Sequence, residues 1–124
     1  MFTKVLKNIL FNISLSRYDN HVNTSEKISE KVNALIIVDI QEKIIRPIFN
    51  KDLMTKNIRK LIDAYQILDE NIFVSEQNPS KLGKTIPELL PKRGFKKIEK
   101  MEFSLANIKE FLKELKNKKI TNLL

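Results

Sequence analysis

The stretch that decides the fold is ALIIVDIQEKI, which runs from Ala34 to Ile44. It opens with five apolar residues in a row, and Asp39 follows them directly. A continuous apolar run of this length, without alternation, is typical of a strand that is buried on both faces of a parallel sheet. The stretch therefore predicts a buried strand that delivers a carboxylate at its end.

The rest of the chain alternates between strand and helix patterns. After the first strand we expect a helix over 52–69, a strand over 71–76, a long loop with one helical turn over 77–94, a strand over 95–100, a helix over 104–118 and the start of a fourth strand over 119–124. This order predicts an α/β fold, a three-layer α-β-α Rossmann-like parallel sheet with right-handed crossovers. We expect about four strands in this sheet.

Both predicted helices are amphipathic. The inward stripe of the first is Met54, Ile58, Leu61, Ile62, Tyr65 and Leu68, and that of the second is Leu105, Ile108, Phe111, Leu112 and Leu115. Asn50 or Asp52 is expected to cap the first helix and Ser104 the second.

The chain divides into an N-terminal basic arm and linker, residues 1–31, and a domain over 32–124. The first 18 residues contain no acid, and their apolar spacing suits a short amphipathic helix. We expect this arm to pack on the domain or on a second subunit, and a targeting or membrane-surface role is the alternative. No apolar run approaches the roughly 18 residues that a membrane span requires.

The formal net charge of +8 is concentrated at the ends of the chain. Residues 91–124 hold 10 basic and 4 acidic residues. Nucleic-acid-binding proteins usually interleave aromatic residues with basic ones. This segment offers only Phe95, Phe103 and Phe111, and we expect the last two in the core, so a nucleic-acid partner is disfavoured.

Charged residues end three of the predicted strands. Asp39, Glu76 and Lys100 each lie at or just past a strand's carboxyl end. In parallel sheets ligands bind beyond those ends, so the pattern predicts a site at one edge of the sheet. No glycine-rich loop follows the first strand, which argues against a nucleotide.

Three stretches together resemble a known family. ALIIVDIQEKIIRPI (34–48), NIFVSEQNPSKLGKTIPEL (71–89) and IEKMEFSLANIKEFLKEL (98–115) are similar, in this order and spacing, to the isochorismatase-like cysteine hydrolases. The resemblance covers roughly residues 32–124. It implies a Cys-Asp-Lys triad in which Asp39 takes the thiol proton and Lys100 keeps the site positive.

The family's cysteine follows the fourth strand in a segment like Gly-Ile-Glu-x-His-x-Cys. This chain has no cysteine, and Leu124 lies within the predicted fourth strand. The resemblance therefore implies an incomplete sheet whose C-terminal part is missing, in a truncated hydrolase domain that is inactive alone. The resemblance implies a cytoplasmic enzyme that cleaves a small amide, imide or vinyl-ether substrate.

Four further residues are candidates for the pocket. Gln41 is expected to hydrogen-bond backbone near the site, with pocket lining as the alternative. Glu76 and Gln77 either line the pocket or tie down the following loop. Phe103 is expected in the core or in the pocket wall.

We expect no metal and no cofactor. Nicotinamidase-type members of the family bind a metal through an aspartate and histidines, and the matching loop here contains no histidine. The partners left open are a homo-oligomer and a separately encoded C-terminal half. A non-catalytic module that binds through the exposed sheet edge and the basic C-terminal third is the alternative function.

Overall fold

The computed structural model describes residues 32–124. The predicted N-terminal arm and linker lie outside the described residues. The described part holds a parallel sheet of four strands in the order β3-β2-β1-β4. The strands are β1 (Asn33–Val38), β2 (Asn71–Gln77), β3 (Phe95–Lys100) and β4 (Asn122–Leu123).

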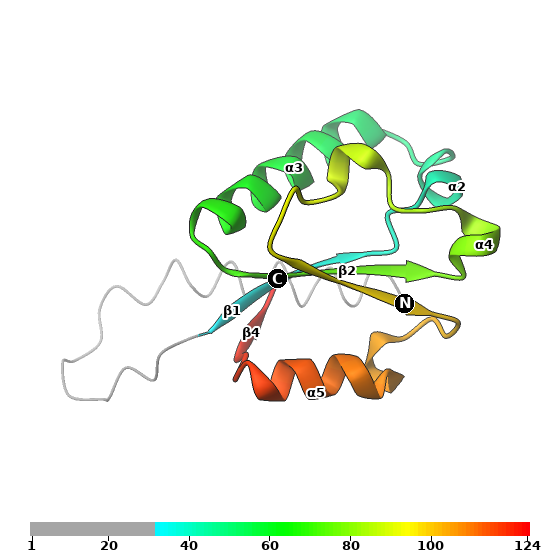
Figure 1. Cartoon of the computed structure of the whole chain (residues 1–124). Helices are drawn as coiled ribbons and strands as arrows, with labels where there is room; N and C mark the ends of the chain where they lie inside the picture. The colour runs from blue at the N-terminus through cyan, green and yellow to red at the C-terminus, as the bar shows by residue number, and fades with distance from the viewer. Residues whose placement is uncertain (1–31) are drawn as a thin grey trace.

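Helices cover both faces of this sheet (Figure 1). Their bounds are α2 (Glu42–Ile45), α3 (Lys51–Ile67), α4 (Pro79–Leu82), the 3₁₀ turns η1 (Pro87–Leu89) and η2 (Leu105–Asn107), and α5 (Lys109–Asn117). Figure 1 shows α3 and η1 on one face and α5 on the other. The predicted three-layer α/β architecture with a parallel sheet is confirmed.

The sheet separates two apolar clusters. On the α3 side the buried members are Leu35, Ile37, Ile45, Ile62, Ile72, Val74, Ile86 and Leu89. On the α5 side they are Ala34, Phe73, Ile98 and Phe111, and the rings of Phe73 and Phe111 meet edge to face at 5.4 Å. Alternate residues of β1 and β2 enter opposite clusters, as strand geometry requires. This two-sided burial explains the unbroken apolar run of β1.

The predicted helical stripes are wider than the faces that pack. Ile62 is fully buried, but Leu61 on the same helix, Leu68 at its C-cap and Leu112 on α5 are exposed. Successive helical residues are about 100° apart, so Leu61 lies on the flank of α3, away from the direction of Ile62. The inward placement of these three leucines is therefore wrong.

The helix ends differ from the prediction in two places. The helix expected over 104–118 is divided at Ile108 into η2 and α5, and Ser104 caps η2 by accepting a hydrogen bond from the backbone N–H of Ala106 at 3.2 Å. Asn50 stands at the N-cap position of α3 but makes no side-chain cap bond. Every helix within residues 32–124 is too short or too polar to span a bilayer.

Candidate active site

Asp39 is placed by a sharp turn directly after β1. Its φ of 53° lies in the left-handed region, which aspartate tolerates better than most residues. Its backbone N–H donates to the carbonyl of Ser75 at 3.1 Å, and its own carbonyl accepts from the N–H of Gln41 at 2.9 Å. Such a conformation costs on the order of 1 kcal/mol and persists because its surroundings hold it.

Lys100 reaches Asp39 across the end of β2. Its Nζ lies 2.7 Å from Oδ2 of Asp39, although the two residues are 61 positions apart in sequence. The Lys100 side chain is 0% exposed and the Asp39 side chain 10%. The sheet order puts β2 between β1 and β3, so the pair spans the carboxyl ends of three parallel strands.

Every polar group of this pair has a partner. The Lys100 ammonium also donates to the carbonyls of Glu102 at 3.2 Å and Phe103 at 3.1 Å, which uses all three of its protons. The second carboxylate oxygen of Asp39 accepts a 2.7 Å bond from the hydroxyl of Ser75. A buried ion pair is tolerated only when such extra bonds complete it. The result is a preorganised anion and cation at the edge where ligands bind in this architecture.

Gln41 joins the loops that follow β1 and β2. Its fully buried amide accepts from the N–H of Gln77 at 2.8 Å and donates to the carbonyls of Gln77 at 2.9 Å and Gly83 at 2.6 Å. Of the two roles considered for Gln41, the structure therefore shows the backbone contacts. Gln77 takes part through its backbone, so it too anchors a loop.

Glu76 does not join Asp39 and Lys100. It follows Val74 by two residues, so it points to the α3 face, whereas Ser75 and Lys100 point to the α5 face. Its Oε1 accepts from the backbone N–H of Thr85 at 2.8 Å and from the Thr85 hydroxyl at 2.9 Å. Glu76 thus lies at the same edge of the sheet as Asp39 and Lys100 but on the other face. Of the two roles considered for Glu76, the structure shows the contacts that tie down the loop.

Opposing effects act on the pKa of Glu76. Burial favours the neutral acid, but the hydrogen bonds from Thr85 and the contact with Lys97, at 3.2 Å, outweigh it. The pKa of Glu76 is therefore held below its ordinary value. Glu76 in turn raises the pKa of Lys97.

The side chain of Phe103 is exposed to solvent. It is 81% exposed, so the expected placement of Phe103 in the core is wrong. The reason is local, because the chain after β3 wraps around the Lys100 ammonium with its carbonyls inward, and the ring is left outward. Phe103 contributes its backbone carbonyl to the site, where it accepts from Lys100.

Pattern analysis missed Ser75, which is buried and bonded to Asp39. The signal was present, since a hydroxyl interrupts the apolar run of β2 immediately before Glu76. Thr85, the partner of Glu76, lies in a loop whose path the sequence pattern does not fix.

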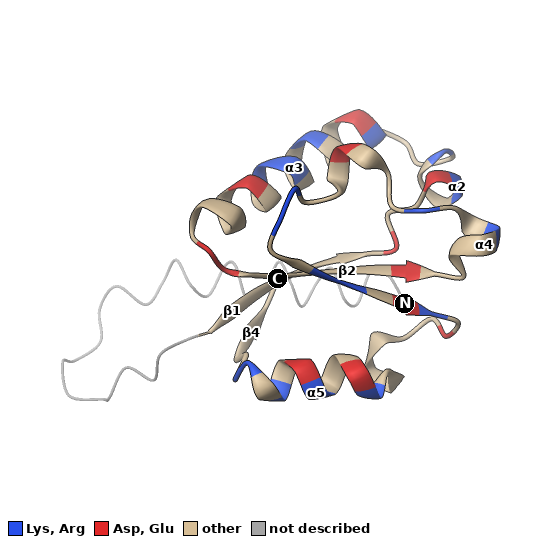
Figure 2. Ribbon diagram, in the orientation of Figure 1, with Lys and Arg blue, Asp and Glu red and all other residues tan. Residues whose placement is uncertain are grey.

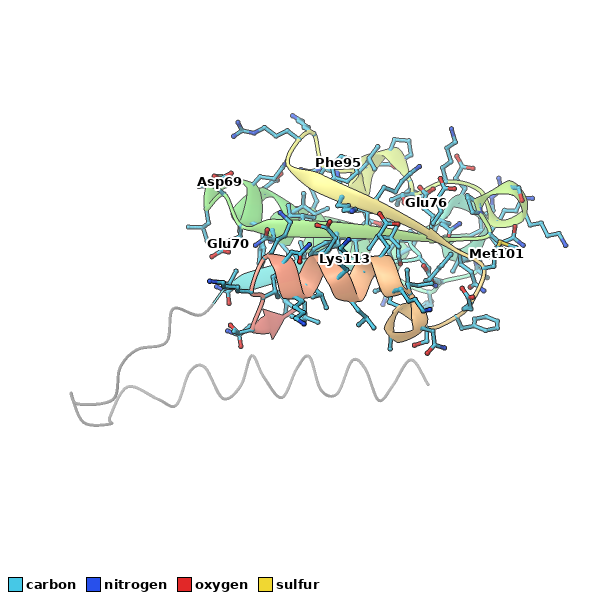
Figure 3. The ribbon with its side chains drawn as sticks, turned by 60° about the horizontal axis from the view of Figure 1, so that its bottom comes forward. Asp69, Glu70, Glu76, Phe95, Met101 and Lys113 are labelled. Carbon is cyan, nitrogen blue, oxygen red and sulfur yellow. The ribbon has the colours of Figure 1, made fainter. Side chains whose placement is uncertain are left out.

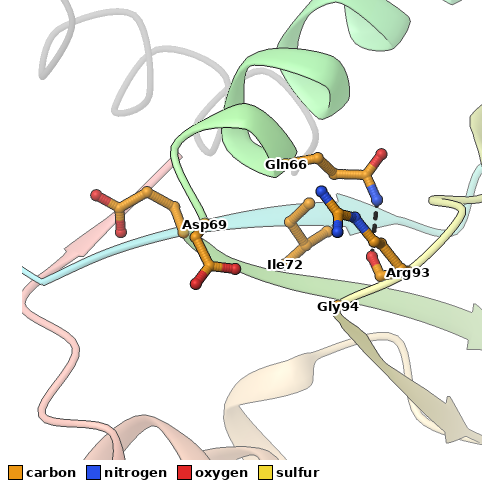
Figure 4. A pocket seen from close by; sticks show the side chains of 6 residues that line it. Gln66, Asp69, Ile72, Arg93 and Gly94 are labelled. Atoms are coloured by element: carbon orange, nitrogen blue, oxygen red, sulfur yellow. Dashed lines mark hydrogen bonds between the residues drawn. The ribbon is translucent and has the colours of Figure 1, made fainter.

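A pocket of about 70 Å³ lies at the opposite edge of the sheet (Figure 4). Its lining is Gln66, Asp69, Glu70, Ile72, Arg93 and Gly94. These residues surround the amino ends of β2 and β3, so the pocket is separate from the Asp39–Lys100 pair. Among the described residues, no group of three or more acidic or histidine side chains is arranged to hold a metal.

Known proteins are similar to this chain in sequence. The family model of the isochorismatase domain matches residues 33–124. Isochorismatase domain-containing protein 2 of Danio rerio is 35% identical over 79 residues, which cover 64% of this chain and 40% of that protein.

Solved structures of other proteins are similar to this chain in fold. A structure described as the MAR1 ribonuclease of Caenorhabditis elegans superposes with a TM-score of 0.67 at 33% identity, covering 79% of this chain and 50% of that one. A hypothetical protein from Trypanosoma cruzi shares the fold, with a TM-score of 0.67 at 19% identity over 75% of this chain and 49% of that one. The chain thus spans about half the length of these relatives or less. The match over residues 33–124, on the fold described above, shows that this chain belongs to the isochorismatase family.

Proposed function

We propose that the chain supplies two of the three catalytic groups of a cytoplasmic hydrolase that cleaves a small amide, imide or vinyl ether. Asp39 is the base, Lys100 is the cation, and the nucleophilic thiol comes from outside these 124 residues, which contain no cysteine. The observation that carries the proposal is the buried 2.7 Å pair between Lys100 and Asp39 at the carboxyl edge of the sheet.

In this proposal each group has the role that the family resemblance implies. The Asp39 carboxylate accepts the proton that leaves the thiol, while the resulting thiolate attacks the electrophilic carbon of the substrate. Lys100 favours the thiolate and the developing oxyanion by its positive charge. Because all three ammonium protons are already bonded, Lys100 acts by its field, and the direct hydrogen bonds to the oxyanion come from other donors.

A second candidate function is a non-catalytic interaction module. β4 pairs only with Asn33 and Ala34 of β1. Backbone bonds on either side of this pairing join Thr121 and Asn122 to Val32, and Leu124 to Ala34 and Ile36, and none reaches Ile37 or Val38. Within the described residues, the carboxyl half of β1 therefore forms an open edge, and open edges pair with other strands.

Sequencing the DNA beyond the Leu124 codon in all three frames separates these candidates. The hydrolase proposal expects a segment like Gly-Ile-Glu-x-His-x-Cys within a few codons. If no frame encodes it, and no separate gene supplies an equivalent half, the interaction module replaces the hydrolase.

Activity provides the second test. The 124-residue chain should show no turnover of small amide, imide or vinyl-ether substrates, since loss of a nucleophile removes a factor on the order of 10⁶ in a protease triad. In a longer or complemented protein, Asp39→Asn and Lys100→Met should each abolish turnover. The matched exposed changes Asp52→Asn and Lys51→Met should leave it unchanged.

A further inference from the structure

The two signs of charge on α5 are sorted onto different faces. The helix contains three lysines and two glutamates (Figure 2). Glu110 and Glu114 both turn toward the sheet, where an Oε1 of each lies 3.0 Å from Nζ of Lys96 on β3. These contacts raise the pKa of Lys96 and lower that of Glu114. One lysine of the sheet thus pairs with both acids of the helix, although the Glu110 side chain remains 68% exposed.

The outer face of α5 is left with a row of cations. Lys109, Lys113 and Lys116 are spaced by four and three residues, which puts them on one side of the helix. All three are exposed, and none forms an ion pair with another residue of the described 32–124 segment. At 1.5 Å per residue the row is roughly 10 Å long. Lys118 and Lys119, which follow the helix, are also exposed.

An exposed aromatic ring precedes this row. Phe103 is six residues before Lys109, and Met101, which is 70% exposed, stands beside it in the sequence. Figure 3, in which the α5 side comes forward, shows Lys113 on α5 and Met101 past the end of β3. The sequence-based argument against nucleic acid required Phe103 in the core, and the structure removes that argument.

We propose that the outer face of α5, together with Phe103, binds single-stranded nucleic acid. The lysine row contacts successive phosphates, and the Phe103 ring stacks on a base. Basic tracks with an adjacent aromatic ring are the general means by which proteins hold single strands without reading sequence. This function is separate from the proposed hydrolase chemistry, because none of these side chains is a hydrogen-bond or ion-pair partner of Asp39 or Lys100.

The test is fluorescence anisotropy of the full 124-residue chain with labelled 12-nucleotide oligo-U and oligo-dT over a range of salt. The triple variant K109Q/K113Q/K116Q should reduce the slope of log affinity against log salt by about 2, since each phosphate contact on a single strand contributes about 0.7. The matched variant K51Q/K56Q/K60Q removes the same charge from exposed lysines of α3 and should leave the slope unchanged. Phe103→Ala should weaken binding by about tenfold at fixed salt without altering the slope.

Three results would overturn the proposal. The first is no binding at low salt. The second is an equal reduction of the salt slope in the α3 and α5 triple variants, which would mean that net charge alone accounts for the binding of nucleic acid. The third is unchanged affinity in Phe103→Ala with heparin bound as tightly as oligo-U, which would identify a general polyanion contact. Circular dichroism of each variant confirms that these surface changes leave the fold intact, and the oligo-U and oligo-dT arms tell RNA from DNA.

Discussion

Replacing Lys100 by methionine tests the central feature of the site. The side chain is fully buried, so the change keeps most of its volume but leaves the Asp39 carboxylate without a counter-charge and two carbonyls without a donor. Breaking a buried pair from one side costs about 3–5 kcal/mol. A domain of this size has a free energy of unfolding on the order of 5–15 kcal/mol, so this one change removes a large fraction of it.

The assay is urea unfolding followed by circular dichroism, with Lys96→Met as the control. Lys96 also pairs with two acids, but it is partly exposed, and exposed pairs contribute about 0–1 kcal/mol. The double variant D39N/K100M should be less destabilised than the sum of its single changes, because removing both charges leaves no buried unpaired ion. A loss below about 1 kcal/mol in Lys100→Met, equal to that in Lys96→Met, would refute the reasoning.

Three further predictions follow from the contacts around the site. Glu76 has a pKa below its ordinary value of 4.5 in the folded chain, so its stabilisation is complete above that value and is lost as the pH falls through the lowered pKa. Urea unfolding between pH 7 and pH 3 should therefore show a steeper loss in the parent chain than in Glu76→Gln. Gln41→Leu should cost about 2–4 kcal/mol by leaving three partly buried backbone groups of Gln77 and Gly83 unpaired, with faster amide exchange at Gln77, and unchanged exchange would contradict this. Phe103→Ala should change the free energy of unfolding by no more than about 0.5 kcal/mol, whereas a loss of 3 kcal/mol would mean that the ring is buried.

The fold was predictable because the strongest local signals agree with the tertiary structure. The unbroken apolar runs of β1 and β2 predicted strands covered on both sides, and the alternation with helices predicted parallel pairing. Helical periodicity could not predict which flank of a helix is covered. Leu68 satisfies the apolar spacing of α3, but nothing in the described residues packs over it.

The candidate site was predictable in part. Strand-end positions brought Asp39, Glu76 and Lys100 to one edge, but the face on which each side chain points depends on strand register, and a slip of one residue reverses it. Glu76 is on the other face because it lies two residues after Val74, whose side chain packs on the α3 side. The pairing of Asp39 with Lys100 came from the family resemblance, since pattern alone gives Lys100 no distinction among 23 basic residues. Phe103 was predicted in the core because it is apolar. The sequence pattern does not show that the backbone after β3 wraps around the Lys100 ammonium and leaves this ring exposed.

The left-handed backbone of Asp39 also decides how this position tolerates genetic change. A single base change in an aspartate codon can give asparagine or glycine, and both accept a φ of 53°. Glutamate, also one base away, keeps the charge but disfavours this conformation and carries the carboxylate one carbon further. The replacements that the turn accepts therefore discard the charge, and those that keep the charge distort the turn. A copy of this domain that drifts at position 39 will tend to keep its shape after it has lost the carboxylate that we propose as the base, so an intact turn in a related sequence is not evidence that the charge survives.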